Sequence, residues 1–261
     1  MSGDRLARFV DRLRGDAYTP RPVGGGFHLW WKGMPDPRDA DPMVDVAVTL
    51  EVLQEPSVPA LYFWALQASF HDSSGARLGA AHTGLQWNHR HAGGRAVNWG
   101  GYIEGGGVTG TIGGTVSTLS GIPGDVNTYD FPWRTGAPYR FVIARSAGGW
   151  TSTVHDLERG EPTVIRELAI GGDRLAGVVV WTEPFCKGTD PPVAVRWSDP
   201  SATRRSGAQV RPMAMDVRYP GGAEWRRTQC DWDGRGFVQA TDTRRTVRHG
   251  TIVPVPQIGR T

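Results

Sequence analysis

The stretch Met43–Leu53, which reads MVDVAVTLEVL, decides the fold class. Valine or leucine occupies every second position from Val44 to Val52, and polar residues such as Asp45 and Glu51 fall between them. Successive side chains of a β-strand point to opposite faces of a sheet. The alternation therefore predicts a half-buried antiparallel strand.

Other short stretches with strand patterns follow, and turn residues separate most of them. Leu61–Phe70 carries apolar side chains on both faces, so both faces should be covered. Gly100–Gly124 is either a mobile loop over a site or a set of strands that another backbone approaches closely. Asp190–Gly207, with its prolines and arginines, is interpreted as a surface loop. The other predicted strands are Ala96–Ile103, Tyr139–Arg145, Trp150–Leu157, Val164–Ile170, Leu175–Glu183, Val193–Trp197, Met213–Tyr219 and Gly236–Thr241.

No helical pattern separates these stretches, which favours an all-β fold, an antiparallel β-sandwich of jelly-roll or concanavalin-like type. A helical pattern is confined to the first residues, where Leu6, Phe9 and Leu13 recur at amphipathic spacing. We predict a short helix over residues 1–17 and a single β-sandwich domain over residues 18–261, a common length for such folds. The N-terminal stretch does not resemble a secretory signal, and no segment reaches the length of a membrane span. We therefore expect a cytoplasmic protein without a membrane partner.

The composition is rich in turn residues and tryptophan. The 261 residues include 36 Gly, 19 Pro and 11 Trp, which predicts many turns and several aromatic surfaces for a ligand. The 29 basic and 26 acidic residues are spread along the chain, and this pattern does not favour a nucleic-acid partner. Cys186 and Cys230 are too few for a disulfide framework. Two buried thiols are favoured, and one disulfide between them stays open.

The densest cluster of polar and aromatic residues lies between His82 and Glu104. In an extended strand Gln86 and Asn88 share a face, as do Asn98 and Tyr102. Amide and phenol groups beside tryptophans suit a sugar, which offers hydroxyls at its rim and an apolar C–H face for stacking. The alternative is a hairpin tip with solvated side chains. The predicted ligand-binding residues are Gln86, Trp87, Asn88, His89, Asn98, Trp99, Trp133 and Trp181.

Four residues are candidates for catalysis: Glu104, Glu183, Tyr102 and His155. Glu183 shares a strand face with Trp181, and loss of water beside an indole raises the pKa of a carboxyl group, as a general acid requires. Glu104 and Glu183 are the best candidates for the paired carboxylates of a glycosidase, which lie roughly 5–10 Å apart. His155 lies on a polar strand face that either recognises hydroxyls or faces solvent.

Two motifs raise the question of metal binding. His89 and His91 are one residue apart, and His82 would complete a three-histidine site for zinc or iron, but a lone His-x-His is a weak signal. Asp231–Gly236 has the carboxylates and glycine of a calcium turn, and equally those of an ordinary tight turn. We therefore predict no metal and no cofactor, with a structural calcium ion as an open alternative.

Three aromatic-rich stretches between Leu61 and Phe185 carry a family resemblance. They are Tyr62–Ala68 with Leu85–Trp87, Tyr129–Gly136 with Tyr139–Phe141, and Leu175–Phe185; the Phe-Pro-Trp-Arg-Thr-Gly element at 131–136 is the most specific. On these residues, over about half of its length, the chain resembles a bacterial family known as domain of unknown function thirty-four seventy-two. The resemblance implies a lectin-like sandwich associated with carbohydrate and brings no established catalytic residues.

Three functions follow as hypotheses. The leading one is a sandwich that binds or processes a carbohydrate through a Trp-rich cleft. The second is a cyclase or isomerase that acts on an isoprenoid or polyketide in a closed aromatic cavity, where tryptophan faces stabilise a carbocation. The third is a structural or interaction protein whose tryptophans form the core. An open groove would favour the first, a closed cavity the second, and buried tryptophans the third.

Overall fold

The computed structural model describes residues 26–104, 110–186, 190–219 and 228–256. Within these ranges the chain forms β-strands and one short 3-10 helix, Ala92–Gly94. The predicted antiparallel β-sandwich is confirmed, while its finer type, jelly-roll or concanavalin-like, stays a prediction. The helix predicted over residues 1–17 lies outside the described residues. None of the described helical residues forms a segment long and apolar enough to span a membrane.

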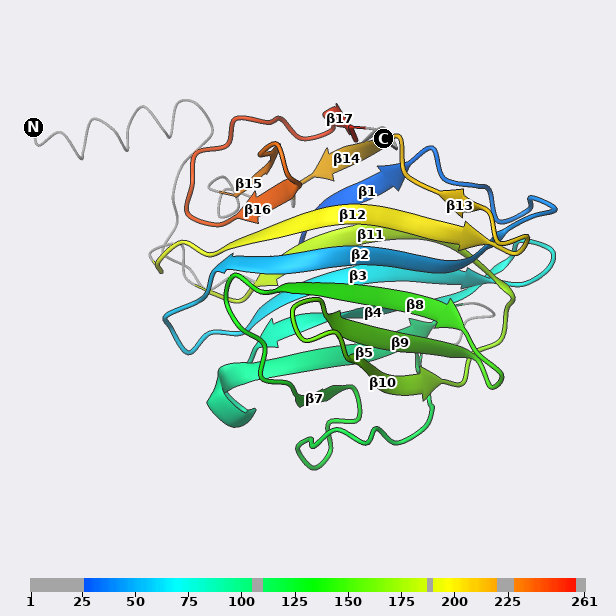
Figure 1. Ribbon diagram of the computed structural model, residues 1–261, viewed down its shortest axis with the longest axis horizontal. Helices are drawn as coiled ribbons and strands as arrows, with labels where there is room; N and C mark the ends of the chain where they lie inside the picture. Colours follow the sequence, from blue (N-terminus) through cyan, green and yellow to red (C-terminus); the bar gives the residue numbers. More distant parts are fainter. Residues whose placement is uncertain (1–25, 105–109, 187–189, 220–227, 257–261) are drawn as a thin grey trace, which may run out of the picture.

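The strands form one hydrogen-bonded sheet that folds into two layers, joined where Leu175 pairs with Met43, and the strands of both layers lie along the same general axis (Figure 1). We call the two layers sheet A and sheet B. Sheet A has the order β5 (Arg95–Ile103), β4 (Arg77–Trp87), β3 (Tyr62–His71), β11 (Arg174–Pro184), β1 (Phe27–Lys32), β14 (Ala214–Arg218) and β17 (Ile252–Pro254). Two short strands, β6 (Gly110–Thr111) and β7 (Thr128–Asp130), pair with the outer edge of β5.

Sheet B lies against sheet A with one apolar face. Its order is β10 (Pro162–Leu168), β9 (Trp150–Asp156), β8 (Pro138–Arg145), β2 (Met43–Gln54), β12 (Ala194–Arg204), β16 (Phe237–Ala240) and β15 (Gln229–Trp232), and β13 (Gln209–Val210) pairs with β12. Alternation in β2 buries Val46, Val48, Leu50 and Val52 between the sheets, as predicted. Val44 is half-exposed, so the alternation reaches the core two residues later than predicted.

A buried amide joins the two sheets inside the core. Gln239 of β16 accepts hydrogen bonds from Thr182 Oγ1 and from the indole of Trp197, both at 2.8 Å, and donates one to the carbonyl of Phe27. Its amide also lies 3.6 Å from the sulfur of the buried Cys230. Both cysteines are free thiols, but Cys186, predicted as buried, is half-buried and lies outside this network. Because each of these polar atoms is buried, the network holds sheets A and B in one lateral position.

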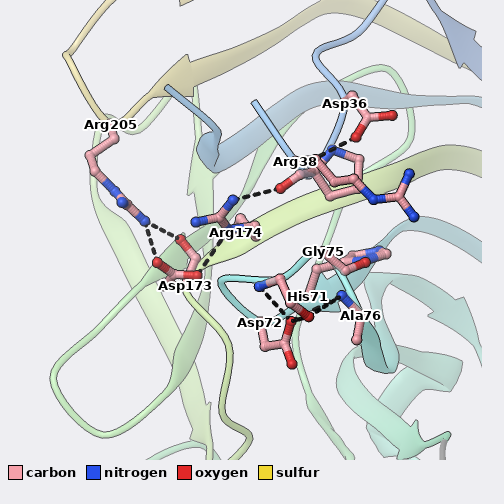
Figure 2. Close-up of polar contacts among 11 residues, drawn as sticks. Asp36, Arg38, His71, Asp72, Gly75, Ala76, Asp173, Arg174 and Arg205 are labelled. Atoms are coloured by element: carbon pink, nitrogen blue, oxygen red, sulfur yellow. Dashed lines mark hydrogen bonds and ion pairs between the residues drawn. The ribbon is translucent and has the colours of Figure 1, made fainter. Parts of the chain in front are cut away.

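A polar corner ties β11 to the loop between β1 and β2 (Figure 2). The guanidinium of Arg174 hydrogen-bonds the carboxylate of Asp173 at 3.0 Å and the carbonyl of Pro37 at 2.7 Å, and Arg205 pairs with the same carboxylate. The hydrogen bond from Arg174, followed by the one from Arg205, lowers the pKa of Asp173. Arg174 is buried, so this corner supplies the carboxylate that its charge needs.

The surface loop predicted over Asp190–Gly207 is largely a strand. β12 continues to Arg204 and pairs with β2 along most of its length. The register shifts between Ser198 and Ser201, and Asp199 there has a φ of 48°. The prolines and the irregular pattern that suggested a loop belong to a β-bulge, which accommodates Pro200 without breaking the ladder.

The glycine-rich segment 110–127 closes one side of the sandwich. Ile112 N donates a hydrogen bond to Gly101 O, and Trp99 N donates one to Asn127 O, so the segment is attached to β5. Thr115 N donates a hydrogen bond to Glu167 O, and Ala169 N donates one to Gly113 O, so the segment is also attached to β10 and the residues that follow it. A side chain at Gly114 would collide with the carbonyl of Glu167. Close backbone approach therefore explains the small residues at this point.

Candidate functional site

Five rings lie together on the outer face of sheet A, the face that points away from the core. They are His28 and Trp30 of β1, Phe63 of β3, His82 of β4 and Trp181 of β11, and we call them the outer-face cluster. Each belongs to the outward-facing alternate positions of its strand. Antiparallel pairing of four strands thus brings together residues that are far apart in the sequence.

The strand register explains why the rings meet. Ala65 of β3 pairs with Trp181 on one side and with Gly84 on the other, and neither Ala65 nor Gly84 has a bulky side chain. The rings of Phe63 and Trp181 pack over Ala65, which is fully buried although it lies on the outer face. This covering of β3 on both faces confirms the prediction made for Leu61–Phe70.

The rings contact one another at specific angles. Phe63 and Trp181 meet edge to face with centroids 4.9 Å apart, and the His82 ring lies 5.3 Å from Phe63 and 5.5 Å from Trp181. His28 stacks on Trp30 at 6.2 Å. Phe63 and Trp181 are 8% and 7% exposed, whereas His28, Trp30 and His82 are half-buried. The last three therefore present the accessible surface of the cluster.

Both histidines of the cluster are uncharged at neutral pH. Burial lowers the pKa of His82 to about 4, because the charged imidazolium loses water there. Burial also lowers the pKa of His28, against a smaller opposing effect of a hydrogen bond with the Gly26 backbone. A neutral imidazole offers one donor and one acceptor. The cluster thus combines apolar rings with uncharged hydrogen-bonding groups.

Glu183 lies at one end of the cluster, where it pairs with Phe63 across β11 and β3. Burial raises the pKa of its carboxyl group, as the sequence predicted from the neighbouring Trp181. Among the described residues, no hydrogen bond or ion pair to its side chain is present. A carboxyl group with these properties is able to hold a proton closer to neutral pH than an ordinary glutamate.

The other side of the cluster carries a compact charged group. Asp216 of β14 pairs with Trp30 in the sheet and is 3% exposed. Its carboxylate binds Lys32 at 3.3 Å and Arg218 at 2.8 Å. Burial alone would raise the pKa of Asp216, but hydrogen bonds from Arg218 and Lys32 outweigh it and lower the pKa. Polar donors therefore border Trp30.

The outer face of sheet B differs in character. Arg196 lies there between Glu51 and Asp233, at 2.5 Å and 2.8 Å, and Arg140 pairs with Asp199 at 3.1 Å. Such paired charges are typical of a solvated sheet face. Of the two outer faces, that of sheet A carries the aromatic cluster, which makes it the better candidate for a ligand.

Two predicted ligand-binding tryptophans lie in the core, which corrects their assignment to a surface. Trp99 is fully buried, and Trp133 is 1% exposed and donates its indole N–H to the carbonyl of Gln86. Trp99 is on the inward-facing set of β5, because its neighbour Asn98 takes the outward position. Trp133 follows β7 and packs edge to face on Trp64 of β3. Neither ring reaches the outer face of sheet A.

Four of the remaining predicted ligand-binding residues, Gln86, Trp87, Asn88 and His89, lie at the end of the β4–β5 hairpin, and Asn98 lies within β5. Gln86 is 5% exposed and accepts a hydrogen bond from Asn88, and His89 is exposed beside the half-buried Trp87. Asn98 is buried and donates to Thr128 Oγ1 at 3.1 Å. The exposed side chain of this set, His89, lies at the hairpin tip. This agrees with the alternative interpretation of the stretch as a hairpin tip with solvated side chains. Trp181 differs from them, because it belongs to the outer-face cluster.

The predicted pair of carboxylates is not a pair. Glu183 shares a row across the sheet with Ala96 of β5, and Glu104 follows the end of β5 eight residues further along. At about 3.3 Å per residue the two lie roughly 26 Å apart along the strands. Glu104 instead pairs with Arg77 at 2.7 Å. Tyr102 is on the same face as His82, one row away.

The other chemical motifs also separate in space. His155 lies on the outer face of sheet B, where it pairs with Arg140 and Pro162, so it does not face the outer-face cluster. His91 is buried and bonds Asp130 at 2.8 Å, away from His82 in mid-strand. Across the described ranges, no group of three metal-ligating side chains is present.

The turn at Asp231–Gly236 is a hairpin between β15 and β16. One carboxylate oxygen of Asp233 accepts the backbone N–H groups of Arg235 and Gly236, and the other pairs with Arg196. A carboxylate that is surrounded by donors and a guanidinium is a poor ligand for a cation. The ordinary tight turn is therefore the better interpretation of this motif.

Sequence reasoning missed several cluster residues. No strand was predicted at Phe27–Lys32, so His28 and Trp30 were not considered for a site. The alternation of Phe27, Leu29 and Trp31 inward with His28 and Trp30 outward was a usable signal. Phe63 was predicted only as part of a strand. His82 was placed in the polar and aromatic cluster and considered for a metal site that was not predicted.

Comparisons with known proteins add little to this site. No protein-family model matches the chain, and no curated protein matches its sequence. The resemblance to domain of unknown function thirty-four seventy-two therefore stays a prediction beyond the β-sandwich that the structure itself shows.

Three solved structures match the chain at low similarity. Scytalido-glutamic peptidase with a transition-state analogue inhibitor is 13% identical with a TM-score of 0.44, over 85% of this chain and 98% of that one. SCP-B, of the eqolisin family of peptidases, is 12% identical with a TM-score of 0.43 over the same shares. The enzymatically active domain of bacteriophage CBA120 tailspike protein 2 is 16% identical with a TM-score of 0.33, over 65% of this chain and 23% of that one. Likeness at these levels carries no conclusion about activity.

Proposed function

We propose that this protein binds a carbohydrate on the outer face of sheet A. The observation that supports the proposal is the outer-face cluster itself, in which rings on four strands lie beside uncharged imidazoles. A pyranose has an apolar C–H face and a rim of hydroxyls, so it needs a ring to stack on and neutral donors and acceptors around that ring. Trp30 is the platform, since it is half-buried whereas Trp181 and Phe63 are almost fully buried.

Polar groups border the platform on both sides. Gln67 pairs with His82 and Val179, and it shares the outer face with them. Lys32 and Arg218 lie on the other side of Trp30, held by Asp216. Amide, imidazole, ammonium and guanidinium groups all hydrogen-bond hydroxyls. A neutral sugar would therefore find donors along its whole rim.

Binding is favoured over hydrolysis. Glu183 has the raised pKa of a proton donor, but the second carboxylate that a glycosidase needs is not beside it among the described residues. Asp216 lies two strands away and is neutralised by Lys32 and Arg218. The cyclase alternative needs a closed cavity lined by several aromatic rings. A cavity of about 590 Å³ between segment 110–127 and Arg166 has one aromatic residue, Tyr129, in its lining, so it fits this alternative poorly.

Titration calorimetry with a panel of neutral oligosaccharides tests the proposal. We expect at least one oligosaccharide to bind, and Trp30→Ala to weaken its affinity at least tenfold, because stacking on the platform is lost. Trp232→Ala is the matched control, since Trp232 is a half-buried tryptophan of the β15–β16 hairpin in sheet B. Absence of binding by every oligosaccharide, or equal loss in both variants, would contradict the proposal.

A further inference from the structure

A cavity of about 590 Å³ lies at the side of the sandwich that segment 110–127 closes. Its wall is largely apolar, with Ile112, Leu119, Ile122 and Tyr129 among the lining residues. One cation, Arg166 of β10, also lines it. The volume is in the range of small-molecule sites in proteins. The cavity is therefore large enough for a ligand and has a single strong polar feature in its wall besides Asp125.

Arg166 is buried without a carboxylate partner. It is 5% exposed, its Nη1 donates to the carbonyl of Val126 at 2.6 Å, and its Nη2 lies 3.4 Å from the carbonyl of Ile112. Its Nε is buried with no hydrogen-bond partner. Within the described ranges, no acidic side chain lies within ion-pair distance of it. A buried guanidinium in this state is costly, because its charge has lost water and gained no counter-charge.

Two other arginines of the described residues differ from Arg166 in this respect, the buried Arg174 and the half-buried Arg196. Arg174 pairs with Asp173, and Arg196 pairs with Glu51 and Asp233. The chain thus supplies a carboxylate where it buries an arginine for structural reasons. The two carbonyl contacts of Arg166 hold segment 110–127 in place, but they leave its charge unbalanced.

The acidic residue in the cavity wall is already engaged. Asp125 accepts the backbone N–H groups of Asn127 and Thr128 on one oxygen, and its other oxygen lies 3.5 Å from Arg90. Its charge is therefore balanced by Arg90 and not by Arg166. An anion that enters the cavity meets one unbalanced positive charge.

We propose that this cavity binds a small organic monocarboxylate with an apolar body. The carboxylate would pair with the guanidinium of Arg166, a group well suited to bind carboxylates. The apolar body would contact Ile112, Leu119 and Ile122. The site is separate from the outer-face cluster, which belongs to β1, β3, β4 and β11. The inference therefore goes beyond the proposed binding of a carbohydrate, and it does not depend on that proposal.

Calorimetry with three probes tests the inference: 4-phenylbutyrate, its neutral amide 4-phenylbutyramide, and inorganic sulfate. We expect the carboxylate to bind at least tenfold more tightly than the amide, and more tightly than sulfate. Arg166→Gln should remove this preference, while Arg159→Gln, a change at an exposed arginine, should leave it intact. Equal binding of carboxylate and amide, no binding of the carboxylate, or sulfate binding as tightly as the carboxylate would each overturn the inference.

A second variant keeps the test decisive if Arg166→Gln does not fold. Gly113 lines the cavity, and a Cβ there would meet no atom within 4 Å, so Gly113→Leu takes up space without a backbone clash. We expect it to weaken carboxylate binding at least fivefold at unchanged thermal stability. Amide-proton shifts of the wild-type protein give the location: the carboxylate should shift residues 111–126. Shifts confined to other segments would also overturn the inference.

Discussion

Phe63 and Trp181 meet edge to face on the outer face of sheet A, with their ring centroids 4.9 Å apart, and together they bury Ala65 beneath them. An aromatic pair of this geometry contributes about 0.5–1.5 kcal/mol beyond the burial of its area. A sheet face without a covering layer thus has a small apolar core of its own.

The coupling between these two rings is measurable. In a double-mutant cycle with Phe63→Leu and Trp181→Leu, we expect an interaction free energy of about 0.5–1.5 kcal/mol in urea unfolding. The rings of Trp232 and Phe237, 5.1 Å apart at the edge of sheet B, provide a matched reference pair. A cycle energy near zero would mean that the two outer-face rings are stabilised only by burial.

The titration of His82 should be visible in the pH dependence of the free energy of unfolding. Its pKa is about 4 when folded and about 6.5 when unfolded, so the unfolded state binds the proton first as the pH falls. Stability should therefore decrease between about pH 6.5 and pH 4, by about 1–3 kcal/mol, and be fully recovered above that window. His82→Gln should flatten this part of the curve, whereas His89→Gln, at an exposed histidine, should not. Identical curves for the two variants would refute the assignment.

Gly84 has a position in β4 that no other residue can take. A Cβ there would collide with the carbonyl oxygen of Trp64 on β3, so Gly84→Ala must push two strands apart. We expect a loss of about 2–3 kcal/mol in the free energy of unfolding, measured by urea denaturation. Gly110→Ala is the control, because a Cβ at Gly110 meets nothing within 4 Å. Comparable losses in both variants would argue against the close strand approach.

The amide of Gln239 should be among the most sensitive positions of the core. Gln239→Met keeps a similar volume but leaves Thr182, Trp197 and the carbonyl of Phe27 without their partner. Each unsatisfied buried group costs about 1–3 kcal/mol, so we expect a loss of at least about 3 kcal/mol. Gln209→Met changes an exposed glutamine and should cost less than about 0.5 kcal/mol. A loss below 1 kcal/mol for Gln239→Met would show that the network is not essential.

The order of strands in the sequence was largely predictable, because alternation is a local property of each segment. The pattern of Met43–Leu53 indicated β2 and its buried valines, and the apolar faces of Leu61–Phe70 indicated a strand covered on both sides. The bulge at Asp199 and Pro200 hid half of β12, because a local irregularity cannot be told from a loop without the partner strand.

The site was predictable only in part. The shared strand face of Trp181 and Glu183 and the raised pKa of Glu183 were predictable, because both follow from residues that are close together in the sequence. The pairing of Glu104 with Glu183 was wrong, since their separation depends on the register of β5, β4, β3 and β11. The predictions for Trp99 and Trp133 failed for a related reason: a tryptophan has the same composition signal in a core as on a surface.

The sequence by itself thus determined the fold class, most strands and the inward or outward direction of their side chains, because these follow from a period of two along the backbone. The tertiary structure decided which outward faces meet. His28, Phe63, His82 and Trp181 come together through hydrogen-bonded register across four strands, and Arg166 faces its cavity through the packing of segment 110–127 on β10. Such contacts join residues distant in the chain, so no local pattern encodes them.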